Sequence, residues 1–343
     1  MYLPNQRTVC YNLRTTLAAI LQHKRTSFPT KLTQLQTSNM HVFVTGASGF
    51  IGTAVVQELQ KAGHQVTGLA RSDASAQKLA AMGAQVQRGS IDDLDSLRAG
   101  AAASEGVIHL AFDHNFADYV GCCERDALAI GAMGSALEGT GKPLVVTSGL
   151  MLLPKGKVVT EADCPDPNNV MTASRGASEK AALDFAARGV RACVMRLAPT
   201  NHGEGDQGFM AVLAARALEK GESAYIGDGA NHWPAAHRLD AASAYRIALE
   251  KGAAGAVYHV AAEGGVPVKD IAAELGKRLA LPVASKSGEE AAAHFGWLAG
   301  FLGADVRTGR GKMGELGWEP VQPSLVEDIR AGVYDKGDTP LQL

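Results

Sequence analysis

The chain has few cysteines and few aromatic residues, and it lacks both a long apolar run and a strong net charge. Its five cysteines among 343 residues are odd in number and show no metal-ligand spacing. They argue against a secreted domain held together by disulfide bonds, and we expect no metal site. A reducing, cytoplasmic location is the default expectation. No apolar run reaches the length of a membrane span, and the net charge of −2 gives no reason to expect a membrane or nucleic acid as partner. Aromatic residues make up only 6% of a chain that is 46% hydrophobic, which predicts an aliphatic core, typical of a parallel sheet covered by helices.

Residues 1–39 contain no Asp or Glu, although they carry five Lys and Arg and many Ser and Thr. Such a composition resembles an organellar transit peptide. Two other interpretations stay open: Met40 is the true start of the domain, or the segment is a disordered or helical tail. We favour Met40, which directly precedes the first predicted strand, and leave organellar targeting open.

The most informative stretch is a short apolar strand, a glycine-rich turn and an apolar-periodic helix over residues 50–61. Gly46 permits a tight turn, Gly49 lets the backbone approach phosphates, and Gly52 lets the helix pack on the strand. Together with a second strand over 65–70 they predict a βαβ unit that binds a dinucleotide pyrophosphate at the helix N-terminus. The alternative is an ordinary turn of an unrelated α/β protein. The expected cofactor contacts here are Thr45, Gly46, Ala47, Ser48, Gly49, Phe50, Ile51 and Gly52.

The residues after the second strand indicate which cofactor is bound. An acidic residue there would hydrogen-bond the ribose 2′-hydroxyl of NAD. The chain has Arg71 and Ser72 instead, and an arginine pairs with a 2′-phosphate through charge-assisted hydrogen bonds. The prediction is NADP, with NAD as a possible cofactor and a solvated surface arginine as the alternative interpretation.

Strands continue to alternate with helices along the chain, which predicts an α/β fold with a Rossmann doubly wound parallel sheet. The length also leaves room for a smaller C-terminal α/β substrate lobe. The expected domains are the basic leader 1–39, a dinucleotide-binding domain 40–200 to which 236–256 return, a substrate lobe of 201–235 and 257–330, and a tail 331–343. Loops at the carboxyl ends of the strands should converge on one cleft. The further cofactor contacts expected there are Ser90, Ile91, Leu110, Ala111, Phe112, Thr147 and Pro199.

Several segments occur in the order found in one enzyme family. They are the glycine turn 45–52, His109-Leu110-Ala111, the strand 144–148, the helix 177–182, and segments 196–203, 237–240 and 316–320. Over residues 40 to about 330 the chain resembles the extended short-chain dehydrogenase/reductases, the NAD-dependent epimerase/dehydratase group.

The resemblance implies a catalytic Ser, Tyr and Lys, with the Lys four residues after the Tyr. None of the seven tyrosines has such a lysine, so the chain is an atypical member in this respect. Anchoring on the helix 177–182 places Arg175 and Glu179 at the two positions, and a shift by one residue places Gly176 and Lys180 there. Arg175 cannot donate a proton, because a guanidinium stays protonated in proteins, but it can polarise a carbonyl or clamp a carboxylate. Lys180 is a candidate ribose contact.

A substitute proton donor is therefore expected if chemistry occurs. His202 is the first choice, because it lies in a glycine-rich loop at the expected cleft and histidine is the usual side chain for general acid catalysis. The alternative is a histidine that only shapes the pocket, and His114, His232 and His237 are weaker candidates. Ser148 is expected to orient the carbonyl, although the resemblance can also place that position at Gly149. The substrate-side candidates are Trp233, His237 and Arg238, with Phe112, His294, Phe295 and Trp297 as further aromatic candidates.

The function predicted from these residues is hydride transfer between NADP(H) and a small apolar or aromatic carbonyl or alcohol. A catalytically silent NADP-binding redox sensor is the alternative, and an epimerase or dehydratase is a third. The expected partner is a small-molecule substrate, with the protein as a monomer or homodimer.

Overall fold

The computed structural model describes residues 39–335, and a seven-stranded parallel sheet forms its centre. The strand order is β11-β7-β5-β4-β1-β2-β3, the arrangement of a doubly wound Rossmann sheet. The predicted fold class is therefore confirmed. The strands are β1 (His41–Thr45), β2 (Gln65–Ala70), β3 (Gln85–Arg88), β4 (Gly106–His109), β5 (Pro143–Gly149), β7 (Arg191–Leu197) and β11 (Ala256–Val260).

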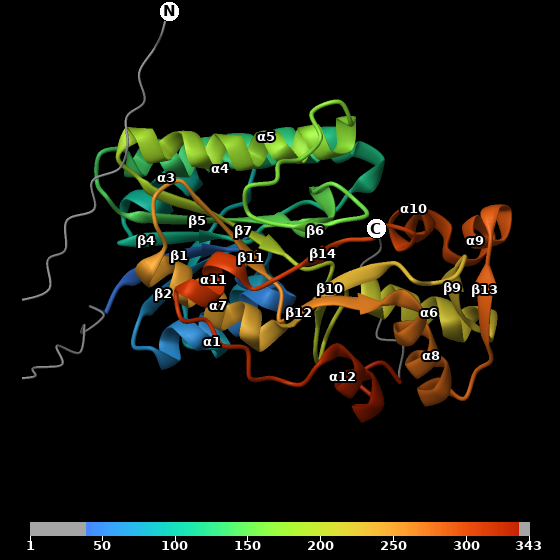
Figure 1. The fold of residues 1–343 in the computed structure, drawn as a ribbon. Helices are drawn as coiled ribbons and strands as arrows, with labels where there is room; N and C mark the ends of the chain where they lie inside the picture. The colour runs from blue at the N-terminus through green and yellow to red at the C-terminus, as the bar shows by residue number, and fades with distance from the viewer. Residues whose placement is uncertain (1–38, 336–343) are drawn as a thin grey trace, which may run out of the picture. The chain divides into compact units, whose positions relative to one another are not determined.

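Helices cover both faces of this sheet (Figure 1). Strand β1 shows why: Val42 and Val44 pack into one hydrophobic cluster and Phe43 into the cluster on the other face. Because successive side chains of a strand point to opposite faces, a strand buried on both sides reads as a continuous apolar run. On one face lie α3 (Leu94–Ala102), α4 (Tyr119–Leu137) and α5 (Val170–Asp184), and on the other α1 (Phe50–Lys61) and α7 (Arg238–Lys251); α2 (Asp73–Ala81) connects β2 and β3.

A second group of elements has its own hydrophobic core, with Trp233 and Phe295 among its largest buried side chains. It contains a three-stranded sheet in the order β12-β10-β8 and a two-stranded pair β13-β9. The strands are β8 (Thr200–His202), β9 (Ser223–Ile226), β10 (His232–His237), β12 (Glu263–Pro267) and β13 (Val283–Lys286). The helices are α6 (Phe209–Lys220), α8 (Val268–Leu279), α9 (Gly288–Phe295), α10 (Ala299–Leu302) and α12 (Leu325–Ala331).

Some residues expected in the substrate lobe pack with the central sheet instead. Strand β11 pairs in parallel with β7. Met313 and Trp318 lie in the same hydrophobic cluster as Val42. Strand β11 thus extends the central sheet beyond β7 and forms its edge. The remaining elements are β6 (Val158–Val159), β14 (Arg307–Thr308), α11 (Gly311–Glu315) and short 3₁₀ turns at Phe116–Asp118, Leu150–Leu152, Phe185–Arg188 and Gly296–Leu298.

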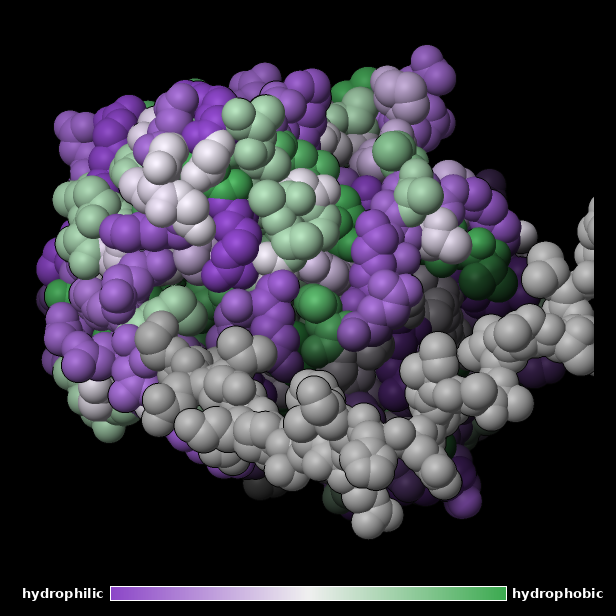
Figure 2. Space-filling model, turned by 60° about the vertical axis from the view of Figure 1, so that its left-hand side comes forward, coloured by the Kyte–Doolittle hydropathy of each residue, from purple (hydrophilic) through white to green (hydrophobic). Residues whose placement is uncertain are grey.

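The visible face in Figure 2 intersperses hydrophilic and hydrophobic residues, as is usual for a protein surface in contact with water. Among residues 39–335, no helix has both the length and the apolar character needed to cross a membrane. The predictions for the basic leader concern residues outside the described part of the chain, apart from Asn39.

Candidate active site

A cleft of about 710 Å³ lies at the carboxyl ends of the central strands, within the size range of pockets that hold cofactors and small ligands. It brings together loops from six strands, as the topology predicts. The predicted site residues that line it are Gly46, Ser48, Gly49, Phe50, Ile51, Gly52, Arg71, Ser90, Ile91, Leu110, Ala111, Phe112, Thr147, Ser148, Arg175 and Pro199.

The glycine turn is built so that larger residues do not fit. Gly46 has a φ of +67°, and a Cβ atom there would lie 2.7 Å from the backbone nitrogen of Ala111. At Gly52 a Cβ would lie 2.0 Å from the carbonyl oxygen of Gly46. Helix α1 follows with no side-chain cap on Gly49 and no acidic residue in its first turn. The positive end of the helix dipole therefore borders the cleft without a competing carboxylate.

Three of the predicted cofactor contacts lie behind the cleft and do not line it. Thr45 Oγ1 bonds His109 Nδ1 at 2.7 Å and accepts from the Ala111 nitrogen at 3.2 Å, which ties the ends of β1 and β4 together. Ala47 is fully buried beneath the turn. Ser72 is the N-cap of α2 and accepts a hydrogen bond from that helix.

Arg71 lies at the end of β2 and is exposed at the cleft. Its neighbour Arg88 is already engaged, since it donates to the Ser72 carbonyl oxygen at 2.7 Å and pairs with Asp73 at 2.7 Å. Arg71 forms no ion pair with any carboxylate of the described part of the chain. Its guanidinium is therefore available to an anion in the cleft.

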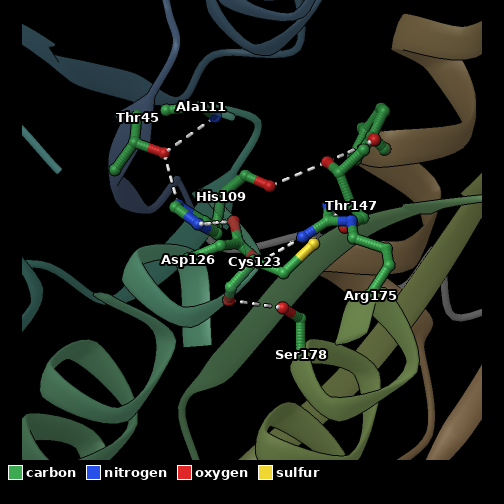
Figure 3. Close-up of polar contacts among 9 residues, drawn as sticks. Thr45, His109, Ala111, Cys123, Asp126, Thr147, Arg175 and Ser178 are labelled. Atoms are coloured by element: carbon green, nitrogen blue, oxygen red, sulfur yellow. Dashed lines mark hydrogen bonds and ion pairs between the residues drawn. The ribbon is translucent and has the colours of Figure 1, made fainter. Parts of the chain in front are cut away.

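Arg175, on α5, lies in a buried polar network beside the cleft (Figure 3). One guanidinium nitrogen pairs with the carboxylate of Asp126 on α4, and another donates to the Thr147 carbonyl oxygen at 2.7 Å. The guanidinium also lies over the Phe112 ring, 4.2 Å from its centroid. Arg175 thus connects α4, β5 and the loop after β4 at a single point.

Asp126 extends this network toward the glycine turn. Its side chain is fully buried, and its Oδ1 lies 3.1 Å from His109 Nε2, whose Nδ1 bonds Thr45. Burial raises the pKa of the Asp126 carboxyl, but the charge of Arg175 and the hydrogen bond with His109 outweigh burial and hold that pKa below its usual range. Asp126 therefore remains the anion that neutralises Arg175.

Ser148 places a hydroxyl at the wall of the cleft. The residue is 5% exposed, and its Oγ has no hydrogen-bond partner among the described residues. Its neighbour Thr147 is satisfied, since its Oγ1 donates to the His109 carbonyl oxygen and bonds the Tyr245 hydroxyl, both at 2.7 Å. A buried hydroxyl without a partner costs free energy unless a ligand supplies one.

Lys180 and Glu179, which follow Arg175 on α5, do not line the cleft. Lys180 is exposed and pairs with Asp184 one turn along the helix. Glu179 is buried and forms two hydrogen bonds with the guanidinium of Arg196 on β7, at 2.9 and 2.7 Å. Glu179 thus forms a bidentate ion pair, and the Lys180 side chain is exposed to solvent.

His202 is not brought to the cleft either. Its ring is 1% exposed, and its Nδ1 lies 2.6 Å from an Asp328 carboxylate oxygen on α12. The ring also makes an edge contact with His237 at 5.4 Å between centroids. The physical reason is strand alternation: Asn201 reaches the cleft, so the next side chain of β8 points to the opposite side.

Of the weaker histidine candidates, one lines the cleft and the others do not. His114 lines the cleft and makes an edge contact with Phe112 at 5.3 Å. Burial and the charge of Arg175 lower the pKa of His114. His232 does not line the cleft and pairs with Asp305 at 3.0 Å.

The predicted substrate contacts also lie outside the cleft lining. Trp233 is fully buried, His237 caps α7, and Arg238 lies over the Phe50 ring at 5.6 Å. Of the further aromatic candidates only Phe112 lines the cleft, whereas His294 and Phe295 border a separate cavity of about 10 Å³. The apolar wall is instead formed by Met151, Leu152, Met171, Phe209 and Phe301.

Sequence reasoning missed several further lining residues, including Tyr119, Asn201 and Asp206. Asn201 precedes His202 on β8, so strand alternation was the signal that could have found it, whereas Asp206 lies in the turn after β8. Asp206 is buried, which raises the pKa of its carboxyl to about 6, and it accepts a hydrogen bond from the Tyr334 hydroxyl at 2.9 Å. Tyr119 lies on α4, where no sequence signal marks it as part of the cleft.

The sequence pattern of the NAD-dependent epimerase/dehydratase family matches residues 42–262, which span the glycine turn, α5 and β7. The chain belongs to this family. The matched residues include the buried Arg175 network and every residue that lines the cleft except Phe301.

Two fungal relatives are similar over their whole length. The uncharacterized protein C2A9.02 of Schizosaccharomyces pombe is 47% identical over 86% of this chain and 100% of its own. The uncharacterized protein YLL056C of Saccharomyces cerevisiae is 45% identical over 85% of this chain and 98% of its own.

Among solved structures, DesIV of Streptomyces venezuelae, a dTDP-glucose 4,6-dehydratase with NAD bound, has a TM-score of 0.70. It is 21% identical, over 86% of this chain and 96% of its own. The UDP-glucose 4-epimerase of Thermotoga maritima has a TM-score of 0.69 at 20% identity, over 86% of this chain and 98% of its own. At this level of identity the likeness concerns the fold of the epimerase/dehydratase family alone.

Proposed function

We propose that the protein is an NADP-dependent oxidoreductase that reduces the carbonyl group of a small apolar or aromatic substrate, or oxidises the corresponding alcohol. The observation that carries this proposal is the composition of one cleft. It has a phosphate-binding turn beside Arg71, the unpartnered Ser148 hydroxyl, and an apolar wall that includes Phe209 and Phe301.

The residues present fit a nicotinamide dinucleotide. Gly46 and Gly52 leave room that a Cβ atom would fill, and the uncapped start of α1 suits a pyrophosphate. Arg71, next to Ser75 at the cleft, suits the 2′-phosphate of NADP. The cofactor supplies or accepts the hydride when it is bound. Membership of a family described as NAD-dependent and the NAD in DesIV support a nicotinamide cofactor.

The chain's own residues act on the substrate oxygen. Ser148 Oγ donates a hydrogen bond to the carbonyl oxygen and orients it. Arg175 adds positive charge beside Thr147, where it favours charge developing on that oxygen, although Asp126 offsets part of its field. Tyr119 and His114 line the cleft, so they replace His202 as our candidates for the proton donor.

An epimerase or dehydratase acting on a nucleotide sugar receives less support. A diphosphate in the substrate part of the cleft would need cationic partners, and Arg71 and Arg175 are the only Lys or Arg among the described residues that line the cleft. Arg175 is paired with Asp126, and Arg71 stands beside the glycine turn.

The test follows NADPH absorbance with a panel of aldehydes, ketones and quinones. We expect turnover on an aromatic carbonyl, with kcat lowered at least about 10-fold by Ser148→Ala and unchanged by Ser135→Ala, an exposed serine on α4. Arg71→Ala should weaken NADPH binding about 10- to 100-fold and NADH binding much less, while Arg98→Ala on the surface changes neither. Tight NADPH binding without turnover on any substrate would support the silent sensor instead. Equal losses of NADPH and NADH affinity in Arg71→Ala would contradict the assignment of NADP.

A further inference from the structure

The cleft contains a second polar atom that has no partner among the described residues. The Asn201 side chain donates its Nδ2 to the carbonyl oxygen of Ala198 at 2.6 Å, while its Oδ1 is buried and unpaired. The bond to Ala198 fixes the orientation of the amide, because a flipped amide would place two carbonyl oxygens against each other. The atom left for a ligand is therefore an acceptor.

Ser148 complements Asn201 within the same cleft. Its buried Oγ, which can donate to a carbonyl oxygen, is also unpaired within residues 39–335. The neighbouring Thr147 hydroxyl, by contrast, makes two hydrogen bonds at 2.7 Å. The cleft is otherwise largely apolar. A ligand that carries both a hydrogen-bond donor and a carbonyl group would supply the missing partners of the Asn201 acceptor and the Ser148 hydroxyl.

We propose that the substrate carries a hydroxyl or N–H donor in addition to its carbonyl, and that Asn201 Oδ1 accepts from this donor while Ser148 Oγ donates to the carbonyl oxygen. The apolar wall of Met151, Phe209 and Phe301 surrounds the rest of the molecule, so the class is a hydroxylated aromatic carbonyl. The proposal rests on the proposed function. It adds that Asn201 determines specificity: a substrate without the donor leaves a buried acceptor unpaired.

The first experiment compares matched substrates with the wild-type protein and NADPH at neutral pH. The probes are the three positional isomers of hydroxybenzaldehyde and their methoxy counterparts. At least one hydroxy isomer should have a kcat/KM about 10- to 100-fold above that of its methoxy partner, because the methoxy oxygen cannot donate to Asn201. Equal values for all three pairs would overturn the proposal while leaving the carbonyl reductase intact.

The second experiment uses Asn201→Leu, which removes the acceptor at similar size. The preference for the hydroxy isomer should fall to about one, whereas the control Asn168→Leu, in an exposed loop, should retain it. The affinity for NADPH should be unchanged in both variants. A 10-fold loss of NADPH affinity with the preference intact would assign Asn201 to the cofactor and refute the proposal.

Two further readouts keep the outcomes separate. If Asn201→Leu does not fold, the wild-type substrate pairs alone decide. If no carbonyl is reduced at all, the proposed function fails, and calorimetry of the same probes with NADP-loaded protein still measures the preference. Tighter binding of a hydroxy isomer would then support the role of Asn201, and equal binding of every pair would refute it.

Discussion

Removing the charge of Asp126 should strongly destabilise the protein. Asp126 is fully buried, and the Arg175 side chain that it neutralises is 9% exposed. Asp126→Asn leaves that guanidinium without its counterion in a low-dielectric environment and weakens the hydrogen bond with His109. Breaking a buried pair from one side costs about 3–5 kcal/mol. Urea unfolding should show a loss of this size in the free energy of unfolding.

The control for this prediction replaces both partners. In the double variant Asp126→Leu with Arg175→Met no buried charge is left, so most of the lost free energy should return. The exposed change Asp95→Asn, which breaks a surface pair with Arg98, should cost less than about 1 kcal/mol. The reasoning is refuted if Asp126→Asn lowers the free energy of unfolding no more than Asp95→Asn does. It is also refuted if the double variant loses as much free energy of unfolding as the single variants Asp126→Leu and Arg175→Met lose together.

The same pair gives a pH dependence with a definite sign. The folded protein holds the pKa of Asp126 below its usual range, so the folded state binds fewer protons here than the unfolded chain does near pH 4. The contribution of Asp126 is therefore complete above that pH and is lost as the pH falls through the lowered pKa. Wild type should lose stability in acid more steeply than the double variant.

Three further perturbations test other parts of the site. Gly52→Ala places a Cβ 2.0 Å from the Gly46 carbonyl oxygen, so it should abolish NADPH binding in a fluorescence titration and cost at least about 1–3 kcal/mol in urea unfolding. His202→Ala should lower stability by about 1–3 kcal/mol, because its hydrogen bond to Asp328 is lost, and should change the turnover of the folded protein by less than about 3-fold. A large loss of kcat would restore His202 as the proton donor. Burial raises the pKa of Asp206 to about 6, so between about pH 4 and 6 its contribution to the free energy of unfolding falls as the pH rises. Asp206→Asn should remove about 3 kcal/mol of that fall in urea unfolding across this pH range, and an unchanged slope would contradict the assignment.

Local features of the chain were sufficient to predict the central sheet and the glycine turn. The turn depends on residues within one βαβ unit, where φ at Gly46 and the packing of Gly52 follow from a short stretch of sequence. Parallel strands buried on both faces are continuous apolar runs, so β1 could be located without any tertiary information. The predicted convergence of the strand ends also needs only the alternation of strands and helices.

The identity of the polar partners could not be predicted, because they come from distant parts of the chain. Arg175 pairs with Asp126, 49 residues earlier, and His202 pairs with Asp328, 126 residues later. Nothing local to His202 indicates that α12 will deliver a carboxylate to it. Phe209 and Phe301 reach the cleft because α6 and α10 pack beside it. The apolar periodicity of each helix does not indicate how the helices are placed relative to the cleft.

The two ion pairs on α5 hold Arg175 and Glu179, the positions at which one register of the family resemblance expects a tyrosine and a lysine. Arg175 and Glu179 are four residues apart, yet they pair with Asp126 on α4 and Arg196 on β7 and not with each other. Each is therefore locked by an opposite charge from a different element. Arg175→Tyr would leave Asp126 buried without a counterion, and Glu179→Lys would set a second cation against Arg196. In that register, restoring a tyrosine and a lysine would break two buried ion pairs, and Tyr119 and His114, the titratable groups beside Phe112, are our candidates for proton transfer.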